Sequence, residues 1–131
     1  MRNMPEVRVC PSNESFLTWI DRPYISAETR AHLSNASALI VPREGYGERS
    51  EIVYFPNGTD NLLFFLKNAE TDEFRVGICI EDRDYKELAL YADVISVAMM
   101  LVTTVVAPLV VNLIADWVDP VSYTHLRAHE T

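Results

Sequence analysis

The chain has 131 residues, a formal net charge of −8 at pH 7 and hydrophobic residues at 49% of its positions. This length and apolar content suffice for one domain with its own core. Because binding of nucleic-acid phosphates needs clustered Lys and Arg, the acidic balance and the lack of a basic cluster exclude a nucleic-acid surface.

The first part of the chain predicts two short helices between strands. Residues 6–10 alternate apolar and polar side chains as a strand does, and Ser12 or Asn13 caps a helix that ends before Pro23. Ser26 caps a second helix, which runs to about Ser34. The apolar run 38–41 is a strand, and we expect it to form a hairpin with residues 51–55 around a loop at 43–50.

The next part predicts a strand, a helix and a strand. The turn at residues 56–58 precedes a helix, capped by Thr59 or Asp60, in which apolar residues repeat at helical spacing up to Leu66. Residues 74–81 alternate as a strand, and Asp82 or Asp84 opens a last helix. The expected fold class of residues 1–90 is therefore α+β, a small two-layer domain with about four strands and three helices.

An apolar stretch follows, since residues 94–115 carry no charged side chain. Roughly 20 apolar residues, at about 1.5 Å per residue, cross a hydrocarbon layer about 30 Å thick. We therefore predict a hydrophobic transmembrane helix over residues 91–118, in a single-pass membrane protein. The basic residues Arg83 and Lys86 precede the helix, which favours an N-terminal domain in the cytoplasm. The alternative is a buried core segment, broken near Pro108, of two consecutive elements.

Two groups of residues are candidates for contacts with partners. Within the apolar stretch, small side chains lie on nearby helical turns and predict a helix-packing face for self-association: Ser96, Thr103 and Ala107. In the loop before the second strand, charges alternate around a tyrosine, and aromatic and arginine side chains are frequent in protein interfaces. This possible partner-binding loop consists of Arg43, Glu44, Tyr46, Glu48 and Arg49.

No catalytic, cofactor or metal site is predicted. Cys10 and Cys79 lack the CxxC spacing of metal or redox motifs. Outside residues 121–131 the sequence contains one histidine, His32. The acidic run 81–84 could present carboxylates to a divalent cation, but acids at the positive end of a helix dipole explain it better.

The last eleven residues, 121–131, resemble a translated sequencing adapter and are set aside from fold reasoning. We accordingly expect the natural sequence to diverge near Pro120 and the chain to be an N-terminal fragment of a longer protein.

The predicted function is that of a membrane-anchored, bacterial-type α+β domain of sensing, scaffolding or partner-binding character. No cofactor is predicted, and an enzymatic activity is disfavoured but left open. Its partners would be the membrane and a protein or a second copy of itself. Two alternatives stay open. One is the N-terminal part of a soluble α/β enzyme whose catalytic residues lie beyond Pro120, and the other is a small toxin whose helix perforates membranes.

Overall fold

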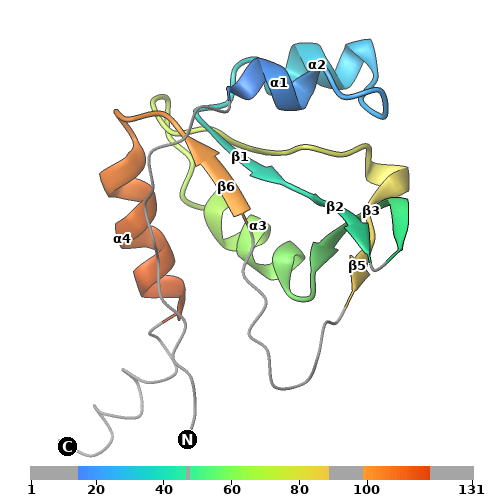
Figure 1. The fold of residues 1–131 in the computed structure, drawn as a ribbon. Helices are drawn as coiled ribbons and strands as arrows, with labels where there is room; N and C mark the ends of the chain where they lie inside the picture. Colours follow the sequence, from blue (N-terminus) through green and yellow to red (C-terminus); the bar gives the residue numbers. More distant parts are fainter. Residues whose placement is uncertain (1–14, 47, 89–98, 119–131) are drawn as a thin grey trace, which may run out of the picture.

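The computed structural model describes residues 15–46, 48–88 and 99–118 (Figure 1). Helices and strands are mixed along these residues, which confirms the α+β class. The elements in chain order are α1 (Phe16–Ile20), α2 (Ala27–Leu33), β1 (Ala38–Val41), β2 (Arg43–Tyr46), β3 (Arg49–Pro56), α3 (Thr59–Lys67), β4 (Val76–Ile78), the 3-10 helix η1 (Asp82–Asp84), β5 (Glu87–Leu88), β6 (Met99–Val102) and α4 (Ala107–Val118).

Strand β1 is the centre of the sheet structure. It pairs in parallel with β4 on one side and antiparallel with β6 on the other, giving a three-stranded sheet in the order β4-β1-β6. After Pro42, which has no N–H to donate to a ladder, the chain continues into β2 and a second sheet in the order β2-β3-β5 (Figure 1). Among the described residues, β4 is therefore an outer strand of its sheet.

Helices cover both faces of β1, so the domain has three layers rather than the predicted two. Alternate side chains of a strand point to opposite faces, and all four residues of β1 are buried. On one face Ala38 and Ile40 join a core with residues of α3, of α4 and of the turn before α4, including Leu62, Leu66, Val106 and Val110. On the other face Leu39 and Val41 join a core with residues of the α1–α2 segment, including Trp19, Ile20, Ile25 and Leu33.

The first three helices lie where the sequence predicts them. Ser26 caps α2, because its hydroxyl accepts the Thr29 N–H at 3.2 Å. The cap of α1 is Ser15 rather than Ser12 or Asn13, which lie outside the described residues. Helix α3 begins at Thr59, and its N-cap is Gly58, in the left-handed region with a φ of 95°, rather than the predicted Thr59 or Asp60.

Two segments differ from their prediction between β1 and β5. Residues 43–46 are not part of a loop but form β2, which pairs antiparallel with β3. The register shifts between Glu44 and Tyr46, where Gly45 has a φ of 95° that glycine adopts without strain. Residues 87–88 form β5 instead of continuing a helix from Asp82 or Asp84, because Phe55 at the end of β3 donates its N–H to the Lys86 carbonyl at 2.9 Å.

The apolar stretch is divided between a strand and a helix. Residues 89–98 lie outside the described residues, and from Met99 the chain forms β6, a turn and then α4. The single helix predicted over 91–118 is therefore wrong for residues 99–118. Proline is tolerated in the first turn of a helix and breaks its interior, so Pro108 sits at the start of α4. Among the described residues, no helix combines the length and the apolarity needed to cross a bilayer.

Candidate functional site

A groove lies between α2 and α3 in the described structure, with the outer side of β4 at its base. Its volume is about 850 Å³. We call it the β4 groove. Residues of the three elements and of the turn after β4 line it: Glu28, Thr29, Ala31, His32, Leu33, Leu63, Lys67, Gly77, Ile78, Ile80, Glu81, Asp82 and Arg83.

The base of the β4 groove is apolar and depends on a glycine. Leu33, Gly77 and Ile80 are buried, and Ile78 is half-buried. A Cβ placed on Gly77 would lie 2.6 Å from Cδ2 of Leu33, well inside van der Waals contact. Glycine at this position therefore lets α2 lie directly on the sheet beside β4, and the exposed part of α2 forms one wall of the groove.

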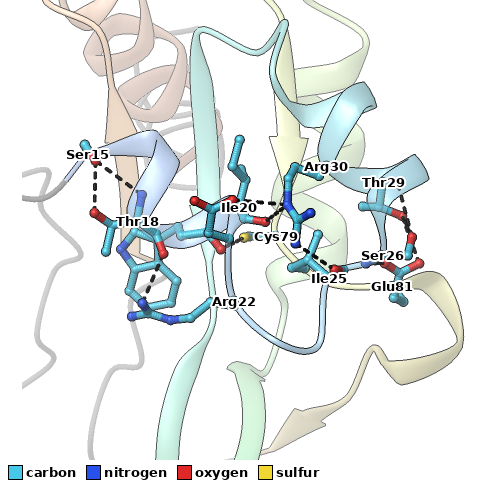
Figure 2. Close-up of polar contacts among 12 residues, drawn as sticks. Ser15, Thr18, Ile20, Arg22, Ile25, Ser26, Thr29, Arg30, Cys79 and Glu81 are labelled. Atoms are coloured by element: carbon cyan, nitrogen blue, oxygen red, sulfur yellow. Dashed lines mark hydrogen bonds and ion pairs between the residues drawn. The ribbon is translucent and has the colours of Figure 1, made fainter.

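A carboxylate from the turn after β4 holds the start of that wall. Glu81 accepts the backbone N–H of Ser26 at 2.7 Å and the hydroxyl of Thr29 at 2.8 Å, as Figure 2 shows. These bonds, the Ser26 N–H first and the Thr29 hydroxyl second, keep the pKa of Glu81 below its ordinary value. The acidic run 81–84 is thus partly explained as a cap, supplied from a distant segment, for the N-terminus of α2.

The segment before α2 is also fixed by hydrogen bonds. Arg30 donates from Nε to the Ile20 carbonyl at 3.0 Å and from Nη2 to the Ile25 carbonyl at 3.3 Å (Figure 2). It forms an ion pair with Asp21 at 3.2 Å as well. These bonds join α2 to the end of α1 and to the loop between the two helices.

The second wall, α3, is anchored at both of its ends. At its N-terminus Glu87 accepts the N–H groups of Gly58 at 2.8 Å and Asp60 at 3.0 Å, and it also accepts the Tyr85 hydroxyl. Beyond its C-terminus Glu70 accepts the Val76 N–H at 2.9 Å. Both walls of the β4 groove are thus joined to the chain that forms its base.

The predicted partner-binding loop lies elsewhere, in the β2–β3 hairpin. The structure commits Glu44 to internal contacts, because Arg22 donates to both of its carboxylate oxygens at 3.0 and 3.3 Å and Tyr24 donates to it at 2.7 Å. Burial first, and then the bond to Glu44, raise the pKa of Tyr24. Glu44 therefore ties the hairpin to the loop between α1 and α2.

The other residues of that loop have separate surroundings. Arg49 pairs with its neighbour Glu51 at 2.5 Å, and Glu48 is exposed. Arg43 is half-buried at the start of β2, and Tyr46, whose side chain is not described, ends the same strand. The structure thus gathers the five residues on one hairpin, and its role as a contact stays a prediction.

The predicted helix-packing face is not brought together on one helix. Thr103 lies before α4 and donates its N–H to the Ser37 carbonyl at 3.0 Å, while Ala107 is the first residue of α4. Ser96 lies outside the described residues. The spacing from Thr103 to Ala107 therefore does not define the surface of a continuous helix, and self-association stays a prediction.

Outside the β4 groove, the described structure contains a buried cysteine and a second hollow. Cys79 is buried and donates its thiol to the Trp19 carbonyl at 3.3 Å, and burial raises its pKa to about 11, which keeps the thiol protonated at neutral pH. A second hollow, of about 390 Å³, lies beside η1 and β3. No group of three or more His, Cys, Asp or Glu side chains among the described residues could hold a metal ion.

The β4 groove was missed by sequence reasoning because its parts come from segments that are far apart in the chain. The one local signal was Gly77, a glycine inside an apolar strand, which often marks a close approach of another element. Protein-family models, curated proteins and solved structures were all compared with the chain, and none of them matches it.

Proposed function

We propose that this protein is a partner-binding module whose β4 groove takes up an extended segment of another polypeptide. The observation that carries the proposal is the position of the groove: it runs between two anchored helices and has an outer strand, β4, at its base. A strand at the edge of a sheet presents backbone N–H and C=O groups that an incoming strand can pair with, while flanking pockets select its side chains.

The composition of the β4 groove supports binding over catalysis. Its base is apolar, as expected for a surface that gains affinity by burying side chains of a partner. Its best-placed carboxylate, Glu81, has its hydrogen bonds committed to α2. Cys79, the nucleophile nearest in sequence to β4, lies in the core on the α1–α2 face and does not line the groove.

The proposal is tested by blocking the groove. Ala31 is exposed on α2 and lines the β4 groove, so Ala31→Trp would fill it without disturbing the core. Asn61, exposed on α3 away from the groove, offers a matched control in Asn61→Trp. Random peptides displayed on phage would be selected against the full chain, and the affinities of the winners measured by fluorescence anisotropy.

We expect the selected peptides to bind the wild type and Asn61→Trp alike and to lose at least about tenfold in affinity for Ala31→Trp, a difference of about 1.4 kcal/mol. Equal affinity for all three proteins would refute the proposed site. A selection that enriches no peptide would refute the proposed function.

A further inference from the structure

The backbone groups of β4 show how a segment could pair with the β4 groove. Ala38 donates its N–H to the Arg75 carbonyl at 3.1 Å, and Cys79 donates its N–H to the Ile40 carbonyl at 2.9 Å, so the backbone groups of residues 75, 77 and 79 face β1. Because a strand alternates, the N–H and C=O groups of Val76 and Ile78 face away from β1.

Two of these four outward groups have partners within the chain. The Val76 N–H donates to Glu70, and the Ile78 carbonyl accepts the Ile80 N–H at 3.0 Å. The remaining two, the Val76 carbonyl and the Ile78 N–H, lie on either side of Gly77, and no group of the described residues bonds to them across the outer side of β4. An acceptor and a donor at this spacing can pair with one stretch of extended backbone, whether parallel or antiparallel.

The charges along the β4 groove are unequal at its two ends. Near the start of β4, Lys67 pairs with Glu70 at 3.5 Å, so its charge is balanced. Near the end of β4, Glu28, Glu81 and Asp82 line the groove together with one cation, Arg83. Glu28 belongs to this end because Glu81 bonds to Ser26 and Thr29 on either side of it. The end of β4 is therefore negative, in a chain whose net charge is −8.

From this arrangement we infer that the partner segment is an extended peptide that adds to β4 as a strand and carries Lys or Arg where it passes Glu28 and Asp82. The inference rests on the proposed function and names the chemistry of the partner. The apolar base accepts every second side chain of the peptide, the two outward groups beside Gly77 bind its backbone, and the carboxylates fix its direction. Complementary charge also speeds association and disfavours acidic competitors.

Defined probes test the charge preference. Two fluorescein-labelled peptides share the core Val-Thr-Val-Thr-Val and end in Lys-Lys or Glu-Glu, and a second pair carries the same charges at the N-terminus. Their dissociation constants would be measured with the full chain at low and high salt. We expect one lysine-tipped peptide to bind about tenfold more tightly than its glutamate-tipped counterpart, and the ratio to fall with added salt.

A variant shows whether the carboxylates cause the preference. Glu28→Gln combined with Asp82→Asn should reduce the lysine-to-glutamate ratio to about one, while Asp116→Asn, at an exposed acid on α4 that does not line the groove, should leave it unchanged. Glu81 is kept, since it caps α2. If the lysine-tipped and glutamate-tipped peptides bind the wild type with equal affinity, the charge preference is overturned. The proposed function would still stand in that case if Ala31→Trp abolished the binding of both peptides.

The strand geometry has its own test. Methylating the peptide nitrogens one at a time removes single N–H donors, and strand addition requires the losses of affinity to alternate along the core with a period of two. Uniform losses, or no binding of any probe, would overturn the inference.

Sedimentation of the full chain tests whether a second copy of the protein occupies the groove. A dimer that is dissociated both by Ala31→Trp and by the peptide would show that a second copy fills the groove, and this result would also overturn the inference.

Discussion

Gly77→Ala is the substitution whose effect follows most directly from the packing of α2 on β4. The added Cβ would lie 2.6 Å from Cδ2 of Leu33 and 3.5 Å from Cδ2 of Leu39. The first distance is a clash and the second an ordinary contact. Leu33 cannot move away freely, because it is 3% exposed and packs in the core on the α1–α2 face. Either Leu33 changes its rotamer or α2 lifts from the sheet.

Two effects of opposite sign decide the free energy of unfolding. Replacing glycine by alanine where the backbone allows it stabilises a protein by about 0.4–1 kcal/mol, because the unfolded chain loses freedom. Overpacking a filled core destabilises by about 1–3 kcal/mol. The clash is the larger effect, so we expect Gly77→Ala to lower the free energy of unfolding by about 1–2 kcal/mol.

Urea unfolding followed by circular dichroism measures this change, and a second substitution identifies its cause. Leu33→Val removes the clashing Cδ2 and costs about 1 kcal/mol by itself. The double variant should therefore be more stable than the sum of the two single effects by about 1 kcal/mol. Gly58→Ala is the control. No atom lies within 4 Å of the added Cβ, so its cost comes from the φ of +95°, which is strained for alanine, and not from contact with Leu33. The effects of Gly58→Ala and Leu33→Val on the free energy of unfolding should therefore be additive. An additive result for Gly77→Ala would refute the close approach of α2 to β4.

Three further outcomes follow from the caps and the core. The pKa of Glu81 lies below the ordinary 4.5, mainly because its carboxylate accepts the Ser26 N–H. Burial acts to raise the pKa of Glu87, but the hydrogen bonds from Tyr85 and from the start of α3 outweigh it and keep this pKa below 4.5 as well. The unfolded chain then binds these protons more readily, so the urea midpoint should fall as the pH drops below about 4.5, and less steeply in Glu81→Gln. Burial raises the pKa of Cys79 from 9.0 to about 11, so its contribution to stability is complete below pH 9 and is lost between pH 9 and 11. At pH 8, iodoacetamide should therefore label Cys79 only after the protein unfolds, and mass spectrometry measures this labelling. Thr59, 2% exposed, donates its hydroxyl to the Pro56 carbonyl at 2.6 Å, so Thr59→Val should cost about 1 kcal/mol in a urea titration, and Thr59→Ser much less.

Local signals predicted a large part of the fold. Ser26 and the acidic first turn after it place the start of α2, the run 38–41 places β1, and the turn at 56–58 places the start of α3. Each signal acts within a few residues, since a cap or a turn needs only its own neighbours along the chain. The predictions failed where long-range pairing decided the outcome: residues 43–46 are a strand because β3 pairs with them, and residues 99–102 are a strand because β1 does.

Read as a helix, the apolar stretch has the length and hydropathy of a membrane span, and nothing within it distinguishes lipid from protein as its surroundings. In the structure, residues 99–102 pair with β1 as strand β6, and Val106 and Val110 join the core on the α3–α4 face.

The same division applies to the candidate site. The sequence by itself determined the class of the fold, the acidic charge and the positions of most helices and of β1, because these depend on composition and on neighbouring residues. Only the tertiary structure decided the three layers and the β4 groove. Its walls come from helices separated by more than one strand along the chain, and the Glu81 that holds α2 contacts Ser26 only once the sheet has formed. Contacts between segments so far apart leave no periodic pattern in a single sequence.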